Sequence, residues 1–119
     1  YLTRWSTPEA LQAGAMNGAF VENFAVSEIW KAFLNAGLEP PLYYFRDKDG
    51  NEIDVVIEMN GKLYPIEIKK TASPNKAMTK AFSCLDRLQL PRSTGVILCM
   101  ASELSAIDSD TYVIPLWMV

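Results

Sequence analysis

Histidine is absent from this 119-residue sequence, and cysteine occurs only twice. Without an imidazole there is no His-based metal site, no Ser-His or Cys-His triad and no histidine general base. Cys84 and Cys99 lack the spacing of metal ligands, and so few cysteines indicate a reduced, cytoplasmic protein. Any catalysis by this chain therefore uses carboxylates, lysines, hydroxyls or thiols.

Long apolar runs are also missing, so the sequence predicts no bilayer-spanning helix and no association with a membrane. The first residues do not have the charged-then-apolar pattern of a secretory signal. Half of the residues are apolar and 11% are aromatic, which is the composition of one folded domain with a core of its own.

Excess positive charge is missing as well, because the net charge is −3 at pH 7. This value argues against a free-standing nucleic-acid-binding protein. The charge is uneven, however: residues 1–60 contain four basic and nine acidic side chains, whereas residues 69–92 contain six basic side chains and one acid. The basic segment would suit a phosphate backbone, and a solvated helix face would have the same composition.

Turn and cap signals divide the chain into helices and strands. Residues 1–16 are expected to form a helical lead-in. The sequence predicts a helix over 19–36 that ends at Gly37, and a second helix over 75–89. Strands are expected over 42–46, 53–59, 62–69, 95–100 and 112–117. The order predicts an α/β fold with a mixed sheet flanked by helices.

The segment EIDVVIEMNGKLYPIEIKK, residues 52–70, contains the most informative pattern. Asn60-Gly61 predicts a two-residue hairpin turn, and the register that it sets places Asp54 directly opposite Glu67. Two like charges beside an apolar core are unfavourable unless a cation lies between them. The pair therefore predicts a site for a hard cation such as magnesium, although a surface ion pair with Lys69 is the alternative.

Strand alternation places Lys69 on the same face as Glu67. It assigns the opposite face of the hairpin to the core, with residues Ile53, Val55, Ile57, Tyr64, Ile66 and Ile68. Glu22 lies on the apolar side of the first helix, at helical spacing from Val26. From periodicity alone, Glu22 is equally well interpreted as a third site carboxylate or as the edge of a wide apolar stripe.

Asp54, followed by Glu67-Ile68-Lys69 on the next strand and preceded by a helix with Glu22, resembles the PD-(D/E)xK nuclease superfamily, whose core order is αβββαβ. The segments GAFVENFAVSEIWKAF, YYFRDKDGNEIDVVIE and GKLYPIEIKK look like the domain of unknown function at the C-terminus of many bacterial and archaeal AAA-type ATPases. The resemblance covers roughly residues 17–100.

The resemblance implies a restriction-endonuclease-like domain over residues 17–119, in a C-terminal fragment of a longer ATPase whose P-loop module lies upstream. It implies Mg²⁺ (or Mn²⁺) held by Asp54, Glu67 and the backbone carbonyl of Ile68, with Lys69 as the catalytic lysine and Glu22 as an accessory carboxylate. The residues expected to contact DNA are Lys70, Lys76 and Lys80.

Two functions of different classes follow. The first is a magnesium-dependent DNA nuclease domain that hydrolyses phosphodiester bonds, which the intact Asp54, Glu67 and Lys69 favour. The second is a non-catalytic nuclease-fold module of the ATPase that recognises DNA or a protein partner, which the acidic composition favours. A homo-oligomer is a further expectation, since many relatives of this fold dimerise.

Overall fold

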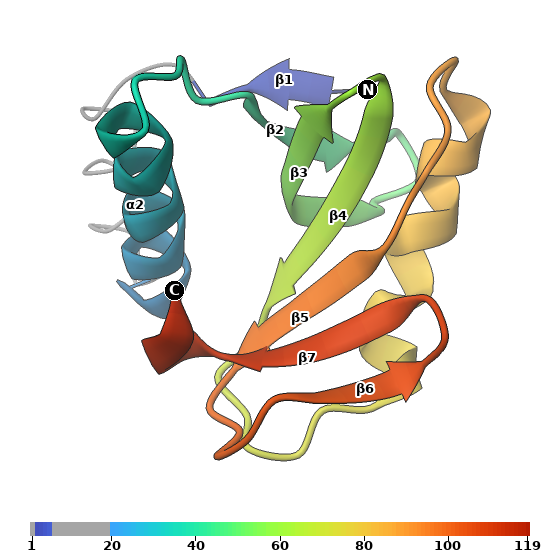
Figure 1. The fold of residues 1–119 in the computed structure, drawn as a ribbon. Coiled ribbons are helices and arrows are strands. Elements are labelled where there is room, and N and C mark those ends of the chain that lie inside the picture. The colour runs from blue at the N-terminus through green and yellow to red at the C-terminus, as the bar shows by residue number, and fades with distance from the viewer. Residues whose placement is uncertain (1, 6–19) are drawn as a thin grey trace.

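A computed structural model describes residues 2–5 and 20–119 of the chain. Within those residues, seven strands form one sheet in the order β1-β2-β3-β4-β5-β7-β6 (Figure 1). The strands are Leu2–Arg4 (β1), Leu42–Arg46 (β2), Glu52–Met59 (β3), Lys62–Ile68 (β4), Gly95–Cys99 (β5), Ser105–Asp108 (β6) and Thr111–Pro115 (β7). Strands β1 to β4 pair antiparallel, β4, β5 and β7 pair parallel, and β6 returns antiparallel to β7. The predicted α/β class with a mixed sheet is confirmed.

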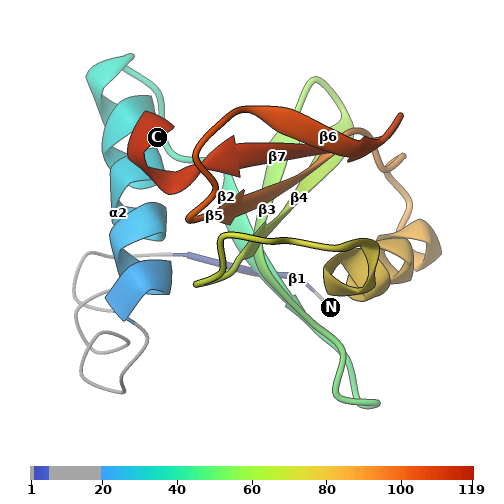
Figure 2. The same cartoon turned by 90° about the horizontal axis from the view of Figure 1, so that it is seen from below.

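Helices cover both faces of the sheet. The α-helix Phe20–Asn35 (α2) lies on one face, and the 3₁₀ helix Lys76–Arg87 (η1) lies on the other (Figure 2). A short 3₁₀ turn, Leu116–Met118 (η2), follows β7. Helix α2 ends where predicted, because Gly37 adopts a φ of +77°, which a glycine accepts without steric cost. None of the helices in the described part of the chain is long and apolar enough to cross a bilayer.

Helix η1 was predicted as an ordinary α-helix and is instead wound as a 3₁₀ helix. The Thr79 hydroxyl donates to the Lys76 carbonyl at 2.8 Å, and the Ser83 hydroxyl donates to the Lys80 carbonyl at 3.4 Å. Such bonds from side chain to backbone offer the carbonyls a local alternative to the α-helical ladder. The apolar side of η1 still packs on the sheet, with Phe82 and Leu85 buried.

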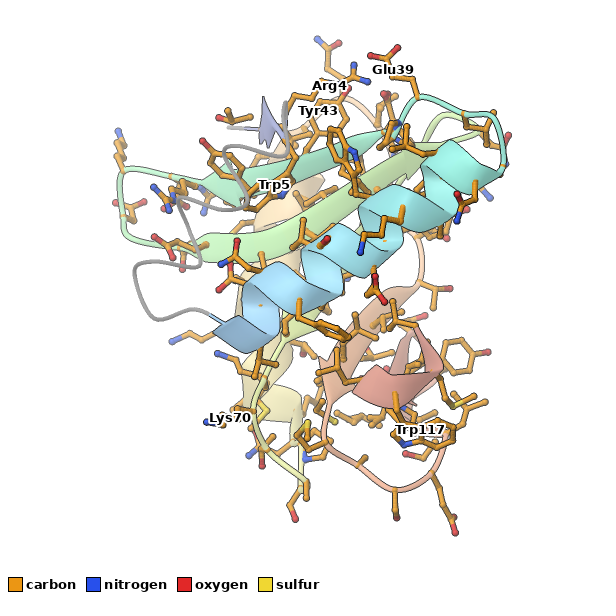
Figure 3. All side chains as sticks on the ribbon, turned by 90° about the vertical axis from the view of Figure 1, so that its left-hand side faces the viewer. Arg4, Trp5, Glu39, Tyr43, Lys70 and Trp117 are labelled. Carbon is orange, nitrogen blue, oxygen red and sulfur yellow. The ribbon has the colours of Figure 1, made fainter. Side chains whose placement is uncertain are left out.

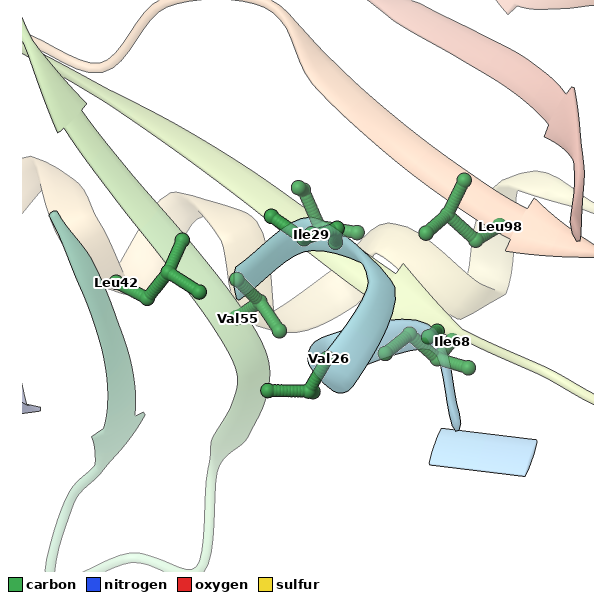
Figure 4. Close-up of a cluster of buried hydrophobic side chains, with 8 residues drawn as sticks. Val26, Ile29, Leu42, Val55, Ile68 and Leu98 are labelled. Carbon is green, nitrogen blue, oxygen red and sulfur yellow. The ribbon is translucent and has the colours of Figure 1, made fainter. Parts of the chain in front are cut away.

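Two apolar layers lie above and below the sheet. Under α2, the helix residues Val26 and Ile29 pack against strand residues of β2 to β5 (Figure 4). Under η1, a second cluster contains Phe82 and Leu85, and a smaller third cluster includes Ile97 of β5. Strand β5 is covered on both faces, which suits its continuous apolar run.

The pairing of β2 with β3 shifts by one residue in front of Asp54. Tyr43 pairs with Val56, but Phe45 pairs with Ile53, so β3 contains an extra residue relative to β2. A bulge of this kind interrupts the alternation of side chains. Ile53 therefore packs under η1 together with Val56, so it is buried as predicted, but contrary to the predicted alternation it does not share a face with Val55.

The helical lead-in expected over residues 1–16 is a strand in its described part, and residues 6–16 lie outside the described residues. Strand β1 pairs with β2 from Leu2↔Phe45 to Arg4↔Tyr43 and occupies the edge that β2 would otherwise expose. Arg4 and Glu39 approach each other at 3.0 Å across this end of the sheet (Figure 3). Strand β6 was not predicted either, since its four residues lack an apolar run.

Candidate metal centre

The β3–β4 hairpin has the register that Asn60-Gly61 predicted. Both turn residues have positive φ, +55° and +75°, and the ladder runs from Met59↔Lys62 to Val55↔Ile66. Asp54 and Glu67 are the next residues beyond the last of these pairs.

Asp54 is held at both its side chain and its backbone. Its Oδ2 accepts a hydrogen bond from the Ile68 amide at 2.9 Å, and its carbonyl accepts one from the Trp5 indole at 3.4 Å. The first bond connects the Asp54 carboxylate to the strand that carries Glu67 and Lys69. These contacts position the carboxylate at the end of the hairpin ladder, next to the bulge.

Glu67 is buried, with 9% of its surface exposed. Its Oε2 lies 3.3 Å from Lys69 Nζ, whereas its Oε1 has no hydrogen-bond partner in the described part of the chain. A buried polar oxygen without a partner is unfavourable and is rare in folded proteins. Either a proton or a cation would relieve this arrangement.

Glu22 of α2 lines the same small pocket as Asp54. Burial, followed by the negative charge of Asp54, raises the pKa of Glu22 to about 7. A hydrogen bond between the two side chains acts in the same direction, since it favours the protonated form of Glu22. Of the two interpretations of Glu22, the contact with Asp54 favours a site carboxylate over the edge of an apolar stripe.

The same two causes, burial and then the charge of Asp54, raise the pKa of Glu67 to about 7. Burial also raises the pKa of Asp54, and the bond from the Ile68 amide opposes that rise. Glu22 and Glu67 therefore each interact with Asp54, and the positive charge of Lys69 lowers the pKa of all three carboxyl groups. Shifts of this kind cluster at functional sites.

The donor set fits a hard divalent cation that keeps most of its water. Oxygen donors from Asp54 and Glu67 are the type that Mg²⁺ and Mn²⁺ prefer, and the unpartnered Glu67 Oε1 is an oxygen with nothing else to neutralise it. Among residues 2–5 and 20–119, no group of three or more His, Cys, Asp or Glu side chains is placed so that it could hold a metal ion. A cation here would thus rely on two carboxylates, a backbone oxygen and solvent.

A small pocket of about 60 Å³ opens beside Asp54. Its lining comes from three elements: Glu22 of α2, residues 44–46 of β2 and residues 52–54 of β3. Sequence reasoning did not single out Tyr44, Arg46 or Glu52, although an arginine at the end of a strand next to acidic residues was visible there. Trp5 was also missed as a contact of Asp54, because no sequence signal links residues so far apart.

The three lysines expected at DNA are all exposed. Lys70 follows β4 and lies below α2 in Figure 3, and Lys76 and Lys80 are on η1. Lys76 makes a 3.8 Å ion pair with Asp108. Further along the basic segment, Arg87 pairs with Asp47 and Arg92 with Asp86, so part of its positive charge is neutralised within the domain.

A second concavity, of about 390 Å³, lies between α2 and the ends of β5 and β7. Apolar side chains dominate its lining, among them Phe24, Met100 and Trp117. Trp117 is 71% exposed here (Figure 3). The lining of this second concavity contains no acidic or basic side chain and therefore no group for acid–base catalysis.

Together the sheet, its two helical layers and the acidic site define a mixed α/β domain with a buried cluster of carboxylates. The chain belongs to the family described as domain of unknown function DUF4143, whose model matches residues 17–119. It is 36% identical over 84 residues to uncharacterised proteins of Mycobacterium bovis and Mycobacterium tuberculosis. That match covers 70% of this chain but only 18% of each relative. A search of solved structures found no match.

Proposed function

We propose that this chain is a metal-dependent nuclease domain, which hydrolyses phosphodiester bonds in DNA with Mg²⁺ or Mn²⁺ and belongs to a longer ATPase. The order of its elements supports a restriction-endonuclease-like core: α2, the meander β2-β3-β4, then η1 and the parallel strand β5 follow the αβββαβ pattern. The small share of each relative that the chain covers agrees with a domain of a larger protein.

The observation that carries the proposal is the buried Glu67 carboxylate, whose Oε1 has no partner in the described residues, beside Asp54 and Lys69. A cluster kept only for stability would gain from replacing Glu67 by a neutral side chain, since burying charge without full pairing is unfavourable. Its presence is explained if the site binds a cation.

The proposed ligands of that cation are Asp54, Glu67 and the Ile68 carbonyl. When bound, a hard cation makes water acidic enough to act as a nucleophile near neutral pH and offsets charge on a phosphate. Asp54 is pre-positioned for its part by the 2.9 Å bond from the Ile68 amide. That bond fixes the carboxylate before any ligand arrives, which reduces the ordering needed on binding.

Lys69 supplies the positive charge of the chain at this site. Its Nζ lies 3.3 Å from Glu67 Oε2, and its side chain is partly exposed, so it can face a nucleic acid as well as the carboxylate. From that position it would orient water and offset negative charge that develops on the phosphate in the transition state. Glu22, with a pKa of about 7, would accept or hold a proton near Asp54.

Two measurements test the proposal. Calorimetric titration with Mn²⁺ should detect binding to the wild type that is lost in Asp54→Asn and kept in Asp49→Asn, which makes the same change in the exposed β2–β3 turn. Magnesium-dependent cleavage should be seen on at least one of four DNA forms, duplex, nicked, branched or single-stranded, and should disappear in Asp54→Ala and Lys69→Ala.

Absence of Mn²⁺ binding at millimolar concentration, or cleavage that survives in both variants, would contradict the nuclease function. The second candidate is then a non-catalytic module of the ATPase that recognises DNA or a protein. The observation in its favour is that ion pairs within the domain occupy Lys76, Arg87 and Arg92 of the basic segment. Metal-independent binding of DNA or of a protein partner, unchanged in Asp54→Asn, would support it.

A further inference from the structure

We propose that Arg46 and Tyr44 form a phosphate-binding subsite beside the metal centre, which holds a backbone phosphate of the nucleic acid next to the one that is cleaved. This inference rests on the proposed nuclease function and extends it to residues outside the D…ExK pattern. Both side chains line the 60 Å³ pocket that also contains Glu22 and Asp54.

The guanidinium of Arg46 contacts Tyr44 and Glu52, which line the same pocket. Its carbon lies 5.3 Å from the centre of the Tyr44 ring, within cation–π distance, and its Nε lies 3.4 Å from Glu52 Oε1. Tyr44 is itself supported by the Trp5 ring, whose centre is 5.4 Å away in an edge-on arrangement. These contacts hold the arginine at the edge of the pocket.

The ion pair of Arg46 with Glu52 is easily exchanged. Both side chains are largely exposed, 68% and 61%, and pairs of this kind contribute little to folding because water and salt screen them. A phosphate presents the planar guanidinium with two oxygens and more charge than a single exposed carboxylate. A phosphate would thus compete with Glu52 for the guanidinium of Arg46.

The acids in the pocket determine which phosphate it takes. Asp54 and Glu22 line the same space and would repel a free anion, so a phosphate is accepted best when a cation offsets the carboxylates. A nucleic-acid backbone carries several phosphates, so it could offer one to Arg46 while a cation held by Asp54 and Glu67 would offset the acids. The ligand class is therefore a nucleic-acid backbone rather than inorganic phosphate.

The chain offers a closely matched control in Arg4. Arg4 also lies over a tyrosine, 5.9 Å from the centre of the Tyr43 ring, and also pairs with an exposed glutamate, Glu39 (Figure 3). It does not line the pocket beside Asp54. Arg4→Gln and Arg46→Gln therefore remove the same charge from similar surroundings, at positions that differ in their relation to the site.

The test is fluorescence anisotropy with a 5′-labelled 20-base-pair DNA duplex, in CaCl₂ and separately in EDTA, over a range of salt concentrations. We expect Arg46→Gln to weaken binding in Ca²⁺ about tenfold and to reduce the slope of log affinity against log salt by about 1. Arg46→Lys should recover part of the affinity, since it keeps the charge but not the fork. Arg4→Gln should stay within about twofold of the wild type.

The proposed subsite would be refuted if Arg46→Gln and the wild type had equal DNA affinity. It would also be refuted if the wild type did not bind the duplex. Mn²⁺ calorimetry on the same proteins separates this failure from that of the proposed function. If the wild type binds Mn²⁺ but Arg46→Gln has the same DNA affinity as the wild type, only the subsite is refuted. If the wild type binds no Mn²⁺, but Arg46→Gln binds DNA more weakly than the wild type and Arg4→Gln does not, the subsite is supported and the metal-dependent function is refuted.

Discussion

Replacement of Glu67 by glutamine should stabilise the metal-free domain. Glutamine has nearly the same shape as glutamate but no charge, and it can donate from its amide to the Asp54 carboxylate. The wild-type side chain is only 11% exposed, and its Oε1 has no partner in the described residues. Burial, and then the charge of Asp54, raises its pKa from 4.5 to about 7.

The size of the effect follows from the pKa. A rise from 4.5 to about 7 corresponds to about 3 kcal/mol of free energy of unfolding, which is shared with Asp54 because the two groups interact. Between these pH values the folded protein binds more protons than the unfolded chain, so the stability of the wild type falls as pH rises through 7 and is then constant. We therefore expect Glu67→Gln to be more stable by about 1–3 kcal/mol at pH 8, with the difference vanishing near pH 4.5.

Urea unfolding at pH 4.5, 6, 7 and 8, in EDTA, measures this difference. Glu103→Gln is the control, because it removes one carboxylate from an exposed loop position. Added Mn²⁺ should reverse the order at pH 8, since only the wild type gains stability from a bound cation. A Glu67→Gln variant that is less stable than the wild type at pH 8, or a difference that does not change with pH, would refute the reasoning.

Three further changes have defined outcomes. Gly95→Ala should destabilise the domain by about 1–3 kcal/mol in urea unfolding, because a Cβ at this position would lie 2.6 Å from the buried Phe82 ring; an unchanged midpoint would show that the ring can move aside. Trp5→Phe removes the indole donor to the Asp54 carbonyl. It should lower the free energy of unfolding by about 1 kcal/mol or less and should weaken Mn²⁺ binding. Equal Mn²⁺ affinity would show that the bond does not position Asp54. The affinity for Mn²⁺ should rise between pH 5 and 7 and level off above pH 7, because the cation displaces a proton from Glu67. Calorimetry at pH 6 should detect the released proton. A constant affinity over this range would contradict the raised pKa of Glu67.

Local signals were sufficient for most elements and for the register of the hairpin. The Asn60-Gly61 turn admits one pairing, and the observed ladder has it. Glycine at position 37 ended α2 as expected. Strand β1 was not evident, because it pairs with the distant strand β2. The 3₁₀ winding of η1 and the strand β6 involve neighbours close in sequence, but the apolar pattern there did not distinguish them from an α-helix and a loop.

At the site, the residue types and their spacing along the strands were sufficient to single out Asp54, Glu67 and Lys69. The bulge before Asp54 could not be predicted, since an extra residue in one strand is defined only against the register of its partner. The contact of Glu22 with Asp54 likewise depends on where α2 packs across the sheet, which periodicity leaves open.

The composition and order of the chain were enough to establish an α/β domain with a carboxylate pair on a hairpin, because turn geometry and strand alternation act over a few residues. Packing between elements distant in sequence produces the burial of Glu67, whose Oε1 has no partner among the described residues, and the contact of Asp54 with Trp5. It also places Arg46 in the same pocket lining as Asp54 and Glu22. Burial and electrostatic coupling are properties of that three-dimensional neighbourhood, and the pKa values near 7 exist only once the sheet and α2 have come together.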